Sequence, residues 1–269
     1  MSGALPTFVT IGAQKCGTTA LHSYLARHPG ISMSRPKELD FFVAAGSWDK
    51  GLDWYRSHWD PALPVRGESS PNYTAHPQHP GVPERMAEVI PDAKLIFMVR
   101  DPIARARASY IHSYSNAVEH RPMHEAIFDR KMAYIERSRY HQQLTRFLEH
   151  YPMERILLLE QDELLHDRRA TLQRVFAFLG AQEDFWRPAF SEPRLETSTR
   201  RRRTRLGVFA AERLSIRWWR KIRDLRLFSK PFEQPPPDDA LRARLEDELR
   251  DDVAAFRALT GRRFETWSI

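Results

Sequence analysis

The sequence predicts an α/β fold in which helices flank a central parallel sheet. Three observations lead to this prediction. Short apolar runs alternate with helical patterns along the chain, which is typical of strands joined by right-handed helical crossovers. The run from Lys94 to Val99 is wholly apolar after its lysine, as expected for a parallel strand covered on both faces. An apolar content of 42% is enough to bury a substantial core.

The first strand is expected at Thr7 to Ile11, where a β-branched and aromatic run precedes a glycine, and helical spacing starts at Thr18. Asp101 and Pro102 supply an N-cap and a first-turn proline for a helix running to about Val118. The remaining elements are expected as short strands at 31–34 and 65–69, a loop at 71–83, a helix at 140–150, a strand at 155–159, a helix at 168–179, a proline spacer at 234–237 and an amphipathic helix that ends at Gly261.

The 269 residues are expected to form a single domain, with a core at about 5–180 and a basic loop and helical C-terminal part at about 181–269. No stretch approaches the roughly 20 consecutive apolar residues of a membrane span, and the N-terminus lacks a signal-peptide pattern. The chain is therefore expected to be a cytoplasmic enzyme. Its single cysteine, Cys16, excludes an internal disulfide and a metal site built from cysteines alone.

The positive charge of the chain is concentrated in one segment. Residues 200–230 contain twelve Lys or Arg against Glu212 and Asp224, a net charge of +10, whereas the whole chain carries +7. A nucleic-acid partner is not expected, because no RNA- or DNA-binding motif accompanies this local charge. Within 206–228 apolar and aromatic residues alternate with arginines. Three interpretations stay open: peripheral membrane contact, a lid over an acceptor, or a surface layer over the core.

The sequence Gly12-Ala13-Gln14-Lys15-Cys16-Gly17-Thr18-Thr19 joins the first strand to the first helix. Glycines let the backbone approach an anion, a lysine supplies positive charge, and threonine hydroxyls can donate to phosphate oxygens. The alternative is a plain turn whose threonines cap the helix. A Walker-type loop would place its lysine after the second glycine, whereas Lys15 precedes Gly17. Arg100, and no acid, ends the second core strand, which suits a phosphate handled without metal.

At this point the sequence resembles the sulfotransferases that use 3′-phosphoadenosine 5′-phosphosulfate (PAPS), especially the branch of the heparan sulfate sulfotransferases in its bacterial type. The resemblance covers about residues 5–180 and implies a P-loop-like three-layer fold, PAPS as donor, 3′-phosphoadenosine 5′-phosphate (PAP) as product, and no required metal. Five motifs in register carry the resemblance, at Ile11 to Leu21, Lys37 to Phe42, Gly51 to Tyr55, Glu68 to Tyr73 and Val99 to Tyr110.

The resemblance assigns roles to individual positions. Glu38 corresponds to the general base, and Lys15 would stabilise the leaving phosphate oxygen. The late nucleotide loop lacks its usual glycine, so only Arg201 and Arg202 are assigned there, by their charge. The other donor-binding positions are the 5′-phosphosulfate loop at Gln14, Lys15, Gly17, Thr18 and Thr19, and the 3′-phosphate site at Arg100 and Ser109.

Two departures bear on the acceptor. Ser69 stands where relatives often carry a lysine, and Asp40 stands where some carry a histidine. Heparan sulfate itself is therefore not the expected acceptor, and a saccharide, glycolipid or small metabolite is expected in its place. Two other functions stay open, a P-loop kinase-like nucleotide enzyme and a module that binds a membrane or a polyanion.

Overall fold

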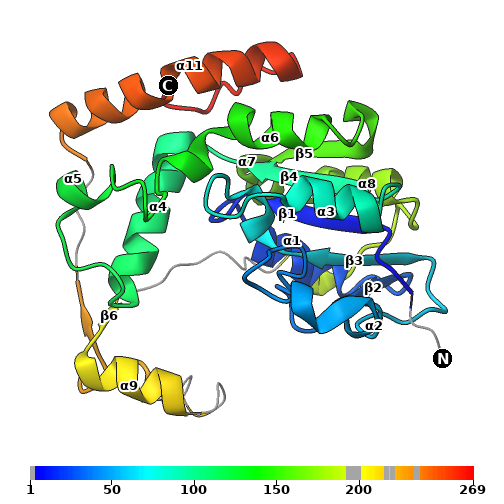
Figure 1. The fold of residues 1–269 in the computed structure, drawn as a ribbon, viewed down its shortest axis with the longest axis horizontal. Helices are drawn as coiled ribbons and strands as arrows, with labels where there is room; N and C mark the ends of the chain where they lie inside the picture. Colours follow the sequence, from blue (N-terminus) through cyan, green and yellow to red (C-terminus); the bar gives the residue numbers. More distant parts are fainter. Residues whose placement is uncertain (1–3, 192–200, 215–217, 219–221, 233–236) are drawn as a thin grey trace.

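The computed structural model describes residues 4–191, 201–214, 218, 222–232 and 237–269. Its central sheet has five parallel strands in the order β2-β3-β1-β4-β5, and helices flank it (Figure 1). The predicted α/β fold with a central parallel sheet is therefore confirmed. The strands are β1 (Phe8–Gly12), β2 (Ile31–Met33), β3 (Val65–Ser69), β4 (Lys94–Val99) and β5 (Ile156–Glu160).

The middle of the sheet is buried on both faces. Every residue of β1 is buried, and so is every residue of β4 after Lys94. The strands β1 and β3 pair Phe8 with Gly67, where a Cβ would lie 2.2 Å from the Phe8 ring, so only glycine fits. Because all five strands are parallel, their carboxyl ends lie at one edge of the sheet, and the loops that follow them can form a common site.

The long C-terminal helix packs along α6, as Figure 1 shows. Its buried Leu245, Leu249 and Phe256 confirm the predicted amphipathic helix. Asp252 accepts hydrogen bonds from the first amides of α6, at 3.1 and 3.0 Å. The described helices are α1 (Thr18–Leu25), α2 (Gly51–Arg56), α3 (Val82–Val89), α4 (Pro102–Ser115), α5 (Met123–Ala126), α6 (Tyr140–Leu148), α7 (Gln161–His166), α8 (Arg168–Leu179), α9 (Arg205–Arg213) and α11 (Asp239–Thr260).

Three segments differ from the sequence prediction or cannot be compared with it. Helix α4 ends at Ser115, three residues earlier than expected, and Ala117 then takes a left-handed conformation with φ 58°. The stretch 71–83, expected as loop, holds a 3₁₀ turn at Pro71–Thr74 and the first residues of α3. The expected proline spacer at 234–237 lies, except for its last residue, outside the described residues.

A basic arm, defined as the described residues of 201–232, projects from the domain (Figure 1). It consists of helix α9 and an antiparallel hairpin of β6 (Arg201–Arg203) and β7 (Ser229–Pro231). Arg202 fixes the hairpin to α4, because its guanidinium lies 3.9 Å from the centroid of the Tyr114 ring and donates to the Tyr114 hydroxyl at 2.8 Å.

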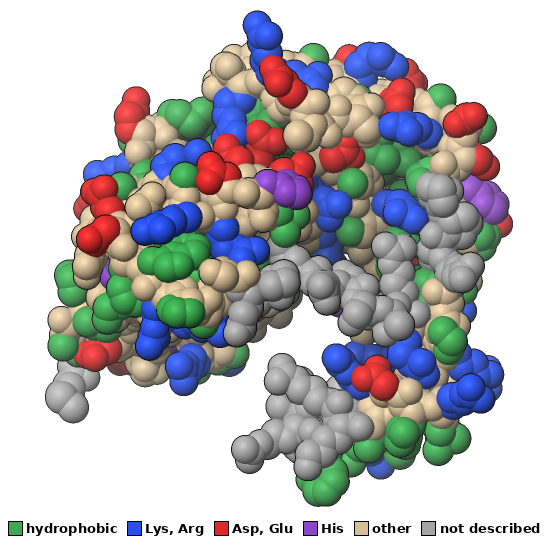
Figure 2. Space-filling model, turned by 180° about the vertical axis from the view of Figure 1, so that it is seen from behind, with side chains coloured by type: hydrophobic (Ala, Val, Ile, Leu, Met, Phe, Trp, Pro, Cys, Tyr) green, Lys and Arg blue, Asp and Glu red, His purple; other side chains and the backbone are tan. Residues whose placement is uncertain are grey.

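Helix α9 does not cover the sheet. Only Gly207 and Ala210 of this helix are buried, and Gly207 lies against the Phe228 carbonyl of the arm itself. Leu206 and Phe209 are each 53% exposed. The interpretation in which this segment forms a surface layer over the core is therefore wrong for α9. Figure 2 shows the molecule hollowed between the arm and the rest of the domain.

Candidate active site

The loop between β1 and α1 is shaped for close approach of an anion. A Cβ at Gly12 would lie 1.8 Å from Thr74 Oγ1, so the loop can begin only with a glycine. Lys15 (φ 71°) and Gly17 (φ 91°) both take left-handed conformations, and the chain turns sharply before α1 starts at Thr18. A left-handed lysine is uncommon, and such strain concentrates at functional sites. The loop and the helix N-terminus together form an anion-binding concavity.

The charge at this loop is predominantly positive. The pKa of Lys15 is lowered to about 8, mainly by burial and also by the charges of Lys37 and Arg105, while the charge of Glu38 opposes this shift. The Lys15 side chain therefore gains and loses its proton close to neutral pH. A lysine with such a pKa can stabilise negative charge on a leaving oxygen and can also donate a proton to it.

Arg100 and Ser109 lie at the same loop. The Arg100 guanidinium donates to the Lys15 carbonyl at 3.4 Å, and Ser109 Oγ donates to Gln14 Oε1 at 3.3 Å. The backbone of Arg100 is held by the Tyr140 hydroxyl, which donates to its carbonyl at 3.0 Å. The strand end at Arg100 and the helix face at Ser109 are therefore brought together with the loop.

The two threonines of the loop have different surroundings. Thr18 is buried, and its Oγ1 accepts a hydrogen bond from Lys37 Nζ at 3.4 Å. Thr19 is exposed. Glu38 forms an ion pair with Lys37, with 2.5 Å between Oε1 and Nζ, and its side chain is 48% exposed. The residue assigned as the base therefore lies opposite the loop, joined to it through Lys37.

A buried carboxylate holds the segment that carries Glu38. Glu68, at the end of β3, accepts hydrogen bonds from the hydroxyls of Tyr55 (2.5 Å), Tyr73 (2.9 Å) and Ser70 (2.6 Å). Ser70 Oγ in turn accepts from the amides of the two residues after Glu38, at 3.1 Å each. Burial raises the pKa of Glu68 to about 7. In the sequence, the motif from Glu68 to Tyr73 is identified only through the family resemblance. The hydrogen bonds show that this motif positions the backbone that follows Glu38.

Sequence reasoning missed Arg137. Its guanidinium donates to Gln78 Oε1 at 3.0 Å and to Asn72 Oδ1 at 2.9 Å, and Asn72 donates to Asp40 Oδ2 at 2.9 Å. Burial lowers the pKa of Arg137 to about 10, while the charges of Asp40 and Glu38 raise it. Arg137 forms no ion pair with any described carboxylate at contact distance. It therefore brings a positive charge to the same side of the site as Glu38.

Arg105 is a second cation that sequence reasoning did not single out. It is fully buried, and it donates to Ser138 Oγ and to the Tyr134 carbonyl. Its Nη1 has no hydrogen-bond partner among the described residues. A buried guanidinium is costly unless negative charge lies near it. Its position beside Lys15 therefore favours an anionic ligand at the loop.

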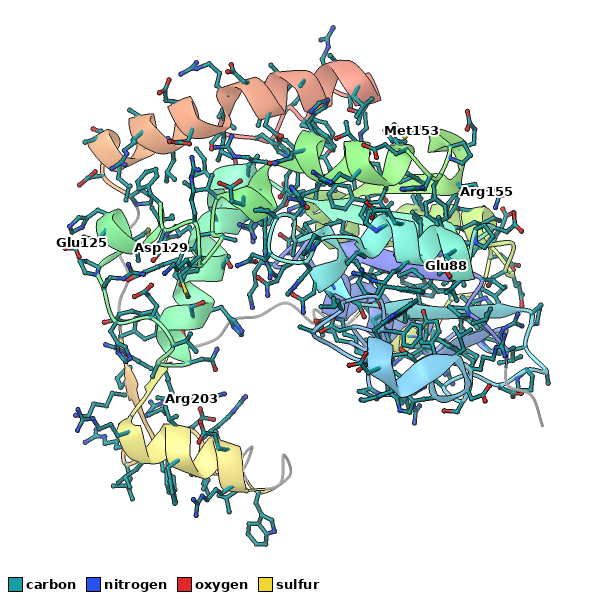
Figure 3. The ribbon with its side chains drawn as sticks, viewed as in Figure 1. Glu88, Glu125, Asp129, Met153, Arg155 and Arg203 are labelled. Carbon is teal, nitrogen blue, oxygen red and sulfur yellow. The ribbon has the colours of Figure 1, made fainter. Side chains whose placement is uncertain are left out.

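The assigned arginines of the arm have partners within the protein. Arg201 donates to the Ser229 side chain at 2.7 Å and to its carbonyl at 2.6 Å, and Arg202 stacks on Tyr114 as described above. Arg203 lies at the junction of the hairpin and α9 in Figure 3, and its charge lowers the pKa of His112 on α4. The donor-binding roles of Arg201 and Arg202 stay a prediction.

His112, on α4, is influenced by charges of both the arm and the loop. The pKa of His112 is lowered to about 4, mainly by burial and also by the charges of Lys15 and Arg203. The imidazole is therefore neutral at pH 7. Its ring is therefore within electrostatic range of both the phosphate loop and the base of the arm.

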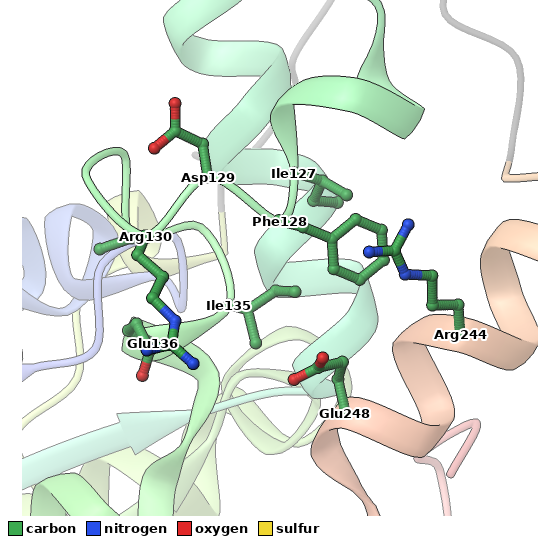
Figure 4. Close-up of a pocket in the computed structure, with 9 residues that line it drawn as sticks. Ile127, Phe128, Asp129, Arg130, Ile135, Glu136, Arg244 and Glu248 are labelled. Carbon is green, nitrogen blue, oxygen red and sulfur yellow. The ribbon is translucent and has the colours of Figure 1, made fainter.

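A separate cavity of about 140 Å³ lies between the 127–136 segment and α11 (Figure 4). Its lining includes Phe128, Glu136 and Glu248, and Arg244 stacks on Phe128 at 3.7 Å. No residue of the phosphate loop lines it. Among the described residues no group of three or more His, Cys, Asp or Glu is arranged to hold a metal ion. None of the described helices is long and apolar enough to cross a membrane.

Together, the parallel sheet, the glycine-bounded loop at its carboxyl edge and the surrounding cations define an α/β protein of P-loop-like architecture with an anion-binding loop. A family model described as "Sulfotransferase domain" matches residues 5–195. The chain belongs to the sulfotransferase family.

Two curated relatives illustrate the sequence similarity. The bifunctional heparan sulfate N-deacetylase/N-sulfotransferase 1 of Caenorhabditis elegans is 30% identical over 178 residues, which are 60% of this chain and 20% of that protein. Human heparan sulfate glucosamine 3-O-sulfotransferase 3B1 is 31% identical over 189 residues, which are 66% of this chain and 47% of that protein. The chain therefore spans less than half the length of these relatives.

Among solved structures, a sulfotransferase from Alicyclobacillus acidocaldarius is similar with a TM-score of 0.72 and 24% identity, over 99% of this chain and 100% of that chain. A sulfotransferase domain from the curacin biosynthetic pathway is similar with a TM-score of 0.51 and 17% identity, over 93% of this chain and 99% of that chain. Both similarities show the fold.

Proposed function

We propose that this protein transfers a sulfuryl group from PAPS to a hydroxyl or amine of a saccharide, glycolipid or small metabolite. The observation that carries the proposal is the convergence of Lys15, Arg100 and Ser109 on one loop, with Glu38 opposite. When bound, PAPS supplies an activated sulfur whose bond to a bridging phosphate oxygen is ready to break.

The residues of the site fit such a donor. Lys15, Thr18 and the loop would hold the 5′-phosphosulfate, while Arg100 and Ser109 would hold the 3′-phosphate. The buried positive charge of Arg105, whose Nη1 has no hydrogen-bond partner among the described residues, supports a polyanionic ligand. PAPS carries phosphate groups at two ends of a nucleoside and is therefore such a polyanionic ligand.

The reaction then needs a base and a stabilised leaving group. Glu38 takes the proton from the acceptor as the acceptor oxygen or nitrogen bonds to sulfur. The bond between sulfur and the bridging oxygen breaks, and its electron pair stays on PAP. Lys15 stabilises the negative charge that develops on that oxygen. The hydrogen bonds from Glu68 through Ser70 to the backbone after Glu38 hold this segment in place during the transfer.

The relatives' names support a saccharide acceptor, but the site argues for one other than heparan sulfate. Ser69, at the position where relatives often carry a lysine, is fully buried, and its Oγ lies 3.1 Å from His22 Nδ1. Asp40 contacts Asn72, which contacts Arg137. The acceptor side therefore presents a mixture of carboxylate, amide and guanidinium groups suited to a polar ligand.

Nucleotide binding separates this proposal from the alternatives. At about 100 times its Kd, PAP should stabilise the native protein by about 2.7 kcal/mol without magnesium. For a chain of this size the Tm should rise by roughly 5 to 10 °C. The measurement is thermal unfolding in EDTA with PAP, compared with ATP and magnesium. Stabilisation by magnesium-ATP alone would favour a kinase-like enzyme, and no effect of either nucleotide would contradict the proposal.

We further propose that the basic arm contacts an anionic membrane surface. Exposed apolar side chains lie among arginines on this arm, a combination that binds anionic lipid interfaces. The charge of the arm complements phosphatidylserine or phosphatidylglycerol headgroups. The apolar residues are Leu206, Phe209, Leu214, Leu225 and Leu227, with Trp218 beside them in the chain, and the described cations among them are Arg205, Arg213, Arg223 and Arg226.

Cosedimentation with vesicles tests this contact. The protein should bind vesicles containing phosphatidylserine, bind pure phosphatidylcholine weakly, and dissociate as salt is raised. A double substitution, Leu206→Ser with Phe209→Ser, should weaken binding roughly tenfold or more because it removes apolar area from the interface. Leu52→Ser, on α2 away from the arm, is the matched control. Equal binding by both variants would contradict the proposal.

A further inference from the structure

Lys37 stands between the phosphate loop and the base. Its Nζ is 2.5 Å from Glu38 Oε1 and 3.4 Å from Thr18 Oγ1. Its side chain is only 17% exposed, and its charge lowers the pKa of Lys15. A single ammonium group therefore contacts both the residue assigned as base and a residue assigned to the donor.

The backbone at this position is fixed, whereas the ion pair is exchangeable. The Lys37 carbonyl accepts from the Ser69 amide at 3.4 Å and from Ser34 Oγ at 3.3 Å. Glu38 is about half exposed, and ion pairs of exposed groups contribute little to stability. The Lys37 ammonium can therefore change partner by rotation of its side chain, without movement of the segment.

We propose that Lys37 is a second lysine of the donor site, which binds the sulfuryl oxygens and releases Glu38 when the donor binds. This inference rests on the proposed sulfuryl transfer. An ammonium has three donors, so Lys37 can keep its contact with Thr18 while it leaves the carboxylate for the sulfuryl group. Glu38 Oε1 is occupied while it accepts a hydrogen bond from Lys37, and release makes this oxygen available to the proton of the acceptor. Occupation of the donor site thus prepares the base for the acceptor.

The comparison of PAPS with PAP isolates this role, because the two differ only by the sulfuryl group. Lys37→Met should weaken PAPS binding by about tenfold or more, the effect of a hydrogen bond to a charged group. PAP binding should stay within about twofold of wild type. Both affinities are measured by titration calorimetry without acceptor. Lys94→Met is the matched control, since Lys94 begins β4 at the opposite edge of the sheet.

The release of Glu38 from Lys37 can be tested separately through the affinity for PAPS. Glu38→Gln should strengthen PAPS binding several-fold in the wild-type background, because Lys37 then has no carboxylate to leave. In the Lys37→Met background the same change should have a smaller effect, since only the charge repulsion between Glu38 and the donor remains.

Three outcomes would overturn the inference: equal loss of PAPS and PAP affinity in Lys37→Met, no loss of either, or an equal effect of Glu38→Gln in both backgrounds. Failure of the wild-type protein to bind PAP or PAPS would instead refute the proposed function itself, so the two failures are distinguishable.

Discussion

Replacement of Glu38 by glutamine should lower kcat by roughly 100-fold or more, the usual contribution of a general base. Glutamine keeps the size of the side chain but cannot take the proton from the acceptor. The segment that carries it should keep its place, because the Glu68 and Ser70 network binds the backbone after Glu38 and not its side chain. The affinity for PAP should therefore stay near wild type.

Steady-state kinetics with PAPS and an acceptor found by screening, together with PAP titration, make this measurement. Glu88→Gln is the control, since Glu88 is an exposed residue of α3 far from the loop (Figure 3). A normal kcat in Glu38→Gln would remove Glu38 from the role of base. A large loss of PAP affinity would show that the change has disturbed the loop as well.

Replacement of Arg100 by alanine should weaken PAP binding by about tenfold or more, because a charge-assisted hydrogen bond to phosphate is lost. A nucleotide without the 3′-phosphate should lose much less affinity. The substitution leaves the backbone contacts of Arg100 with Tyr140 in place, so the start of α4 should keep its geometry.

The two affinities are compared by calorimetry with PAP and with adenosine 5′-monophosphate. Arg155→Ala is a matched control, since Arg155 pairs with Asp92 at the amino-terminal end of β5, away from the loop (Figure 3). Equal losses for the two nucleotides would place Arg100 elsewhere than at the 3′-phosphate. Its contact with the Lys15 carbonyl would then be the main role.

The sequence predicted the elements whose signals are local. Strand β4 and the cap at Asp101 follow from a few adjacent residues, and Asp101 does accept the Ala104 amide at 2.6 Å. The β6–β7 hairpin was not predictable in this way, because three residues on each side pair across a gap of more than 20 residues. Strand β6 consists of three arginines and β7 reads Ser-Lys-Pro, so neither strand carries an apolar alternation.

The residues of the site were likewise predictable where their signals are local, and not where they depend on tertiary packing. Gln14, Lys15, Arg100 and Ser109 belong to motifs with fixed spacing, and the structure brings these four together. Arg137 reaches the site only because a loop of irregular sequence folds back on the segment at Asn72. No spacing rule reports such a contact, since it depends on tertiary packing of surface segments.

The close approach of Gly12 and Thr74 has a consequence for changes to specificity. Thr74 Oγ1 donates to the Ile11 carbonyl at 3.1 Å and fills the space that a side chain at Gly12 would need. The Ser70 amide donates to the Thr10 carbonyl, also at 3.1 Å. The segment 70–74, next to the acceptor side, is thus hydrogen-bonded to strand β1, which leads into the donor loop. Because the two segments are joined by these hydrogen bonds, a substitution that changes the shape of the acceptor side will also shift the backbone of the donor loop.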